Sequence, residues 1–182
     1  MSDISQRYER LSQAFADKVA AVPEDRWESP SPCEDWDARE VVRHVVGTHA
    51  VFLGLIGEPA PDGPSVDEDP AGAFAAVRRA VLERLEDPDV ATRTYEGQLG
   101  VHTFEWAVDR FQSFDLVVHG WDLALATGQD EAIPPEEVQR LSGEAQARGD
   151  ASRSPDVFGP ALEPPPDADE QTRLLAFLGR RV

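Results

Sequence analysis

The sequence has one cysteine, Cys33, among its 182 residues, so no disulfide can form within the chain. A chain of this size without disulfides is typical of a reducing compartment. Its first residues, Met1-Ser2-Asp3-Ile4, lack the basic start and apolar run of a secretory signal peptide. The chain also has no run of about 18 uncharged apolar residues that could span a bilayer. We therefore expect a cytoplasmic protein.

Positive charge is scarce as well. The chain has 17 Lys and Arg residues against 35 Asp and Glu residues, and its formal net charge is −18. Such a chain repels phosphate backbones and anionic lipid surfaces unless a local basic patch intervenes. The closest candidates are the pairs Arg78-Arg79 and Arg180-Arg181, which are too small to form one. We therefore expect neither a nucleic acid nor a membrane as a partner.

What the chain does have is enough apolar side chains, 41% of its residues, for a core of its own. Its length predicts a single domain over residues 1–182. Apolar residues recur at helical spacing, with Pro or Gly at the boundaries, in four long stretches. These are Ile4–Val22, Asp37–Ile56, Ala71–Leu85 and Thr103–Thr127. Asp37 and Glu40 are predicted to form a capping box at the start of the second stretch, and Gly128 stands where the fourth should end.

Shorter segments complete the pattern. Residues 89–102 are interpreted as a short extended segment or a long loop, and Pro134 opens a short helix. A closing helical segment is expected over Glu170–Leu178. Four main helices with long connections predict an all-α protein, a four-helix bundle with a short C-terminal helical segment.

Two side chains on the fourth predicted helix have the spacing of metal ligands. Asp115 and His119 are four residues apart, so they share one helical face about one turn apart. That helix is apolar on nearly every side, which indicates a buried position, and an unpaired carboxylate is costly there. A metal ion would satisfy both groups, although an Asp and a His at this spacing often form only a hydrogen-bonded pair.

A third ligand has to come from another helix, and the second predicted helix offers His44 and His49. His49 lies nearer the centre of the apolar face, so periodicity alone slightly favours it. Either histidine could also be an ordinary core or surface residue. We interpret Cys33 as a small buried residue and His102 as an exposed one. The same reasoning assigns three tryptophans to core packing: Trp36, Trp106 and Trp121.

Several segments resemble one known family. Residues 31–47 (SPCEDWDAREVVRHVVG) and 115–124 (DLVVHGWDLA) are similar to the two signature regions of the DinB-like metal-binding proteins of actinobacteria. Residues 158–161 (FGPA) and 173–180 (RLLAFLGR) resemble the C-terminal segment of that family. The family is related to the N-terminal domain of mycothiol-dependent maleylpyruvate isomerase.

The resemblance implies a DinB-like four-helix bundle with a metal held by His44, Asp115 and His119. It therefore overrules the preference for His49. The isomerase has Glu where this chain has Asp115, and it carries a further C-terminal domain for which 182 residues leave no room.

Three protein ligands leave a coordination position open, which is typical of catalytic metal sites. The ligand set suits zinc first, then nickel or ferrous iron. With the resemblance, this favours a transferase or isomerase that uses a low-molecular-weight thiol, mycothiol or bacillithiol, on an electrophilic small molecule. Trp121 and Asp122 are expected behind the ligands, with Asp122 orienting a donor. A metal-dependent hydrolase and a non-catalytic ligand-binding protein remain open alternatives, as does a homodimer. No general base is identified.

Overall fold

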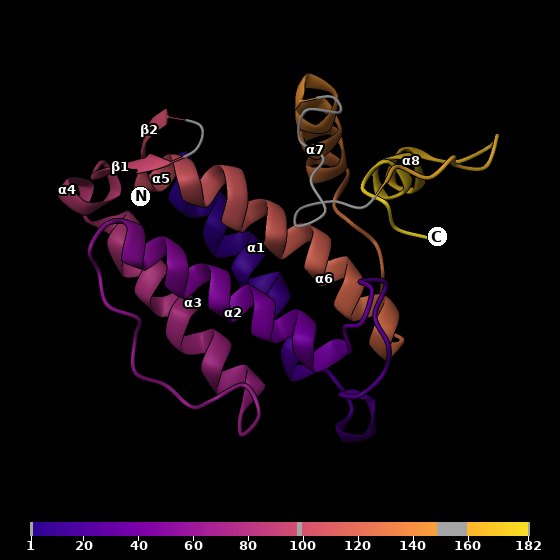
Figure 1. Ribbon diagram of the computed structural model, residues 1–182, viewed down its shortest axis with the longest axis horizontal. Helices are drawn as coiled ribbons and strands as arrows, with labels where there is room; N and C mark the ends of the chain where they lie inside the picture. The colour runs from indigo at the N-terminus through magenta and orange to yellow at the C-terminus, as the bar shows by residue number, and fades with distance from the viewer. Residues whose placement is uncertain (1, 98–99, 149–159, 182) are drawn as a thin grey trace. The chain divides into compact units, whose positions relative to one another are not determined.

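The computed structural model describes residues 2–97, 100–148 and 160–181, and it divides the chain into two compact units, 1–130 and 131–182 (Figure 1). The first unit contains four long helices. These are α1 (Asp3–Ala20), α2 (Ala38–Leu55), α3 (Pro70–Glu86) and α6 (Ser113–Thr127). The predicted four-helix, mostly α-helical architecture is confirmed.

The four helices form a closed ring of contacts. Helix α1 packs against α3 and α6, and α2 packs against the same two helices on the other side of the core. The α2/α6 seam and the α1/α3 seam are therefore different faces of the bundle (Figure 1). In the core, the Phe15 ring of α1 meets the Phe74 ring of α3 edge to face, with centroids 4.8 Å apart.

Local sequence explains where these helices begin and end. The Asp37 carboxylate accepts a hydrogen bond from the Glu40 N–H at 2.8 Å and so caps α2, as the sequence pattern predicted. Helix α6 ends at Gly128, whose left-handed backbone (φ 74°) suits a residue without a Cβ. Every residue of α6 except Asp115 and Leu125 is buried, which confirms the expectation of a central helix.

The segment between α3 and α6 is more varied than the sequence indicated. It contains α4 (Pro88–Ala91), the antiparallel hairpin of β1 (Thr94–Gly97) and β2 (Gly100–Thr103), and α5 (Phe104–Ala107). A π-helical turn, η2 (Val108–Gln112), then leads directly into α6. The predicted fourth helix thus has the expected limits, but one widened turn interrupts it.

The remaining elements are short. A 3₁₀ turn, η1 (Glu24–Arg26), follows α1. The second unit contains α7 (Pro135–Arg148) and α8 (Glu170–Phe177), and within it the Ile133 N–H donates to the Gln171 side chain at 2.9 Å. Residues 158 and 159 of the FGPA segment lie outside the described part of the chain.

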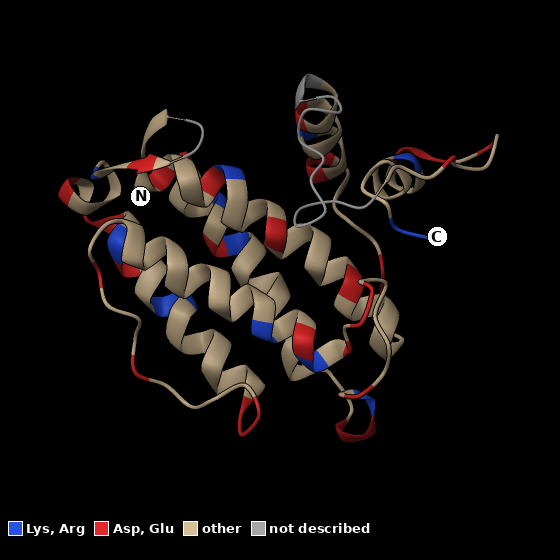
Figure 2. Ribbon diagram, in the orientation of Figure 1, with Lys and Arg blue, Asp and Glu red and all other residues tan. Residues whose placement is uncertain are grey.

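Acidic positions occur on the helices and on the connections between them, with fewer basic positions interspersed (Figure 2). None of the described helices has both the length and the apolar character needed to cross a bilayer.

Candidate metal centre

Three potential ligands converge at the α2/α6 seam. His44 comes from α2, and Asp115 and His119 come from successive turns of α6. His44 Nε2 lies 3.7 Å from Asp115 Oδ2, and the His44 and His119 rings have centroids 4.7 Å apart. One donor atom from each residue lies within 4.8 Å of the other two. The structure thus places on one site the three residues named by the family resemblance.

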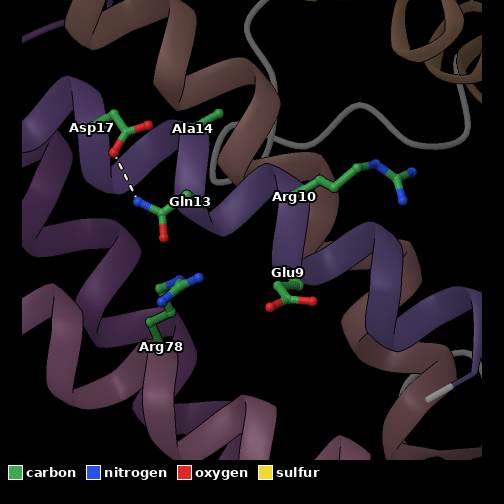
Figure 3. A pocket seen from close by; sticks show the side chains of 6 residues that line it. All are labelled: Glu9, Arg10, Gln13, Ala14, Asp17 and Arg78. Atoms are coloured by element: carbon green, nitrogen blue, oxygen red, sulfur yellow. Dashed lines mark hydrogen bonds between the residues drawn. The ribbon is translucent and has the colours of Figure 1, made fainter.

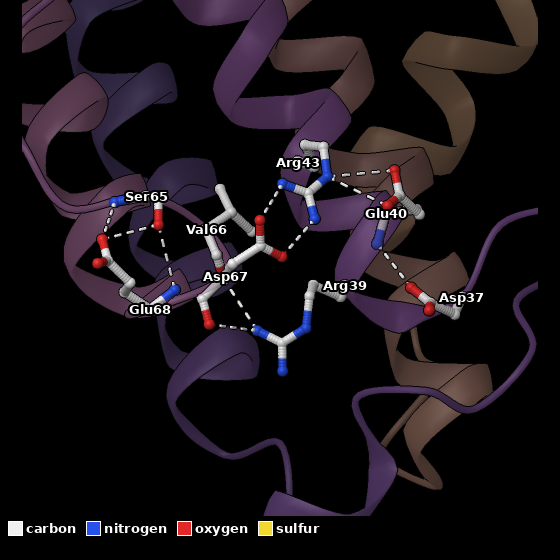
Figure 4. Close-up of polar contacts among 8 residues, drawn as sticks. All are labelled: Asp37, Arg39, Glu40, Arg43, Ser65, Val66, Asp67 and Glu68. Atoms are coloured by element: carbon white, nitrogen blue, oxygen red, sulfur yellow. Dashed lines mark hydrogen bonds and ion pairs between the residues drawn. The ribbon is translucent and has the colours of Figure 1, made fainter.

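Two arginines at the start of α2, the helix that carries His44, make polar contacts with neighbouring acidic residues and main-chain carbonyls (Figure 4). Arg43 pairs with Asp67 at 2.8 Å and with Glu40 at 3.1 Å. Arg39 donates to the main-chain carbonyls of Val66 and Asp67. The acidic loop before α3 is therefore attached to the helix that carries His44.

Asp115 is the charged member of the group, and its side chain is 20% exposed. Burial acts to raise the pKa of its carboxyl group, but interaction with His44 and the nearby imidazole of His119 outweigh burial. The pKa of Asp115 is therefore below its ordinary value, so the residue is a carboxylate at neutral pH.

A buried carboxylate orients His119 from behind. Asp122 Oδ2 accepts a hydrogen bond from His119 Nδ1 at 2.9 Å, and the Asp122 side chain is fully buried. Because an ionised carboxylate can only accept, Nδ1 is the donor in this pair, and Nε2 is the ring nitrogen left to face a metal ion. A metal-binding histidine commonly has such a partner. Trp121, the other residue expected behind the ligands, is buried in the core.

Cys33 also reaches this region, which no sequence pattern indicated. Its Sγ donates to Asp122 Oδ2 at 3.4 Å, and Cys33, His119 and Asp122 form a second group of potential ligands. The thiol is half-buried. It lies in a tight turn that contains Asp35 in a left-handed backbone (φ 62°). The interpretation of Cys33 as a simple buried residue is wrong, because the turn aims its side chain at α6.

Two aromatic assignments need comment. Trp36 is half-buried and packs against the core, as the sequence indicated. Its ring also lies beside both imidazoles of the candidate site, with centroids 4.8 Å from His44 and 5.8 Å from His119. His102 is half-buried and stacks on the half-buried Trp106 at 3.6 Å, so it is not the exposed loop residue that was expected.

His49 does not join the ligand group. It is completely buried, its Nδ1 donates to the Val45 carbonyl at 2.7 Å, and its ring faces Tyr8 and Phe74. Burial lowers the pKa of His49 to about 4, so its imidazole is neutral. The helical pattern correctly placed His49 on the apolar face, but that face points into the bundle.

The bundle also has a surface pocket of about 430 Å³ on a different seam (Figure 3). Its lining comes from α1 and α3 and mixes both signs of charge: Glu9, Arg10, Gln13, Ala14, Asp17 and Arg78. None of the candidate ligands lines this pocket, so it is not the metal centre.

Part of the chain matches a known protein family. Residues 8–80 match the mycothiol maleylpyruvate isomerase N-terminal domain, a stretch that includes His44 but not Asp115 or His119. Two uncharacterized proteins of Mycobacterium tuberculosis, MT0763 and Rv0738, are each 29% identical over 177 residues, which are 96% of this chain and 96% of each relative.

A crystal structure of a mutant mycothiol-dependent maleylpyruvate isomerase is similar at a TM-score of 0.55 and 14% identity. The match covers 79% of this chain and 68% of the isomerase chain, and it shows a shared fold. The chain is therefore a mostly helical bundle that shares its fold with this isomerase. Over residues 8–80 it is similar to the N-terminal domain family of mycothiol maleylpyruvate isomerase.

Proposed function

We propose that this chain binds a divalent metal ion through His44, Asp115 and His119. We further propose that it uses a low-molecular-weight thiol of the mycothiol type to transfer or isomerise an electrophilic small molecule. The observation that carries the proposal is the convergence of three donor atoms from two helices within 4.8 Å. The relation to a mycothiol isomerase domain supports the choice of thiol.

The donor set fits the group that it would hold. Two imidazoles and one carboxylate suit zinc first, with nickel or ferrous iron as alternatives. The 3.7 Å between His44 Nε2 and Asp115 Oδ2 is near the separation of two ligands that each lie about 2.1 Å from one ion. When bound, such an ion supplies Lewis acidity that lowers the pKa of a thiol at its open position.

The chain's own residues have separable tasks in this proposal. Asp115 contributes negative charge, because its lowered pKa keeps it ionised. His44 and His119 contribute neutral nitrogen donors, and Asp122 holds the His119 ring in one orientation. The Trp36 ring shields the two imidazoles on one side. Cys33 donates to Asp122, so its thiol restrains the carboxylate that orients His119.

The experiment that tests the proposal is a titration of mycothiol into cobalt-substituted protein without an affinity tag. We expect a sulfur-to-cobalt charge-transfer band that S-methylated mycothiol, the matched control, does not produce. Bacillithiol is titrated in parallel to test whether the thiol can be exchanged. The His119→Ala variant is expected to give no band.

An unchanged spectrum with both thiols at millimolar concentration contradicts the thiol-dependent reading. Hydrolysis of an ester or amide panel without thiol then favours a metal-dependent hydrolase. Tight binding of a ligand without turnover favours a non-catalytic binding protein.

A further inference from the structure

His49 is singled out by the sequence and has no role in the candidate metal centre. Its side chain is completely buried, and while Nδ1 bonds to the Val45 carbonyl, Nε2 has no hydrogen-bond partner among the described residues. The neutral ring presents a lone pair at Nε2. A buried acceptor left without a donor is costly, so its surroundings need an explanation.

His49 is one of several such residues. Within the described part of the chain, six buried side-chain atoms have no hydrogen-bond partner. They belong to four elements, α1, α2, η2 and α6, and include donors as well as acceptors: Ser5 Oγ, Tyr8 Oη, His49 Nε2, Gln112 Oε1, Gln112 Nε2 and Ser113 Oγ. Each of these residues is 0% exposed. Native interiors leave few polar atoms unpaired, so a group of them indicates a common missing partner.

Contacts between helices place three of these residues at one level of the bundle. In α2, His49 lies between His44 and Phe52. His44 contacts Asp115, and Phe52 contacts Phe111. His49 is therefore at the level of the residues between Phe111 and Asp115, which include Gln112.

On the α1 side, Arg7 pairs with Asp109 at 2.8 Å, and Phe15 approaches Gly120. These contacts put Tyr8 within about a turn of Gln112. The Tyr8 and His49 rings are themselves 5.9 Å apart between centroids.

We propose that Tyr8, His49 and Gln112 form an internal water-binding site between α1, α2 and the start of α6. The three side chains together offer a hydroxyl, an amide that both donates and accepts, and an imidazole acceptor. A buried water molecule typically makes two to four such bonds, so about one or two water molecules would satisfy the group. The site would lie inside the bundle, whereas the metal ligands lie at its α2/α6 seam.

A π-helical turn gives independent support for a special position at Gln112. Gln112 is the last residue of η2, and such turns frequently occur at functional positions. The widened turn precedes α6 directly, and the Gln112 amide is buried although Gln usually lies at the surface. A partner inside the bundle would explain why an amide occupies this position.

The direct test is a crystal structure of the full chain at atomic resolution. We expect ordered water within hydrogen-bond distance of at least two of Tyr8 Oη, His49 Nε2 and the Gln112 amide. Direct hydrogen bonds among these side chains with no water between them would overturn the proposal. A dry, unpaired group of polar atoms would overturn it as well.

The sign of a stability change provides a second test. If water joins the group, Gln112→Leu deprives the water of partners, and the melting temperature should fall by on the order of 5 °C. Tyr8→Phe should also lower it, and the double variant should lose less than the sum because both changes affect one network. If the atoms are dry, Gln112→Leu removes two unpaired groups and should raise the melting temperature, which would refute the site. Metal content is measured in each variant and should not change.

Discussion

Helix α2 carries two histidines five residues apart, and their surroundings differ in almost every respect. The His44 side chain is 33% exposed and lies beside a carboxylate, a second imidazole and a tryptophan ring. His49 is completely buried, and its ring lies against Tyr8 and Phe74. The His44 side chain is therefore accessible to a ligand that arrives from solvent, whereas the His49 side chain is enclosed in the core.

Because of this difference, residue type alone does not identify a candidate metal ligand. Both imidazoles could bind a metal, but only His44 has other potential ligands within reach of one ion among the residues that the structure describes. His44 and His49 differ in their access to solvent and in the number of other donor atoms nearby. Substitutions in the two regions can test whether His44 and His49 differ as sharply as the geometry implies.

The largest effect is expected from removing a ligand. His119→Ala eliminates one donor and leaves the buried Asp122 carboxylate without the hydrogen bond it now receives from Nδ1. We expect most of the bound metal to be lost, measured by mass spectrometry of tag-free protein.

The matched control for that experiment is His49→Gln. This substitution changes a histidine of α2 that does not belong to the group of candidate ligands. It should retain metal at the wild-type ratio. Loss of metal in His49→Gln with full retention in His119→Ala would reverse the assignment of the two regions.

A pH titration of stability tests the buried region. Burial lowers the pKa of His49 from 6.5 to about 4 in the folded protein, so the unfolded chain binds a proton more readily. Stability should therefore fall as the pH falls from about 6.5 to about 4, by about 3 kcal/mol from this group. Below that range its contribution should be constant.

The measurement is urea unfolding of metal-free protein across this range, with His49→Gln as the non-titrating reference. The Asp115 contribution changes in the same direction, because its pKa is also depressed: it stabilises the fold above its ordinary value of 3.8 and is lost at lower pH. The pH ranges over which His49 and Asp115 lose their contributions therefore hardly overlap. Parallel stability curves for the wild type and His49→Gln would show that His49 is not held neutral by burial.

A smaller effect is expected behind the metal centre. Asp122→Asn keeps the shape of the side chain but removes the charge that fixes the proton on His119 Nδ1. Metal affinity should fall about 10–100-fold, measured by competition with a chelator. Cys33→Ser, which can still donate to Asp122, should lower it much less. Equal affinities in wild type and Asp122→Asn would remove Asp122 from the proposal.

The smallest effect is expected at the exposed fastening of α2. Arg43→Ala removes the ion pairs with Asp67 and Glu40, both on the surface. Pairs of this kind contribute little to stability, so metal content should be unchanged and the melting temperature only slightly lower. Calorimetry and metal analysis of the same preparation check both values. A large loss of metal would mean that the acidic loop sets the position of His44.

The sequence predicted the long helices because periodicity and capping are local properties. Asp37 caps α2 in the structure as its spacing to Glu40 indicated, and Gly128 ends α6. The pairing of Asp115 with His119 also follows from positions on a single helix. Periodicity could not choose between His44 and His49, because that choice depends on how α2 is rotated against α6. The resemblance supplied the missing register.

The contacts of Cys33 and Trp36 with the candidate site could not be predicted for a related reason. Both lie just before α2, in a turn whose path depends on Asp35 adopting a left-handed backbone. Spacing along the sequence gives no direction for a side chain in such a turn. The π-helical turn was missed because a widened turn leaves no distinctive pattern in a single sequence.

The π-helical turn η2 affects which residues share a face along the helical segment from Phe104 to Thr127. A residue added to an α-helix advances the following side chains by about 100°, and η2 absorbs such an advance within Val108–Gln112. Residues before and after it therefore follow two different angular phases. Because the widened turn already accommodates the extra residue, deleting one residue from η2 should leave a regular α-helix in which Asp115 and His119 still face His44. The same deletion within the regular turns of α6 would rotate the side chains on either side of it by about 100° relative to one another.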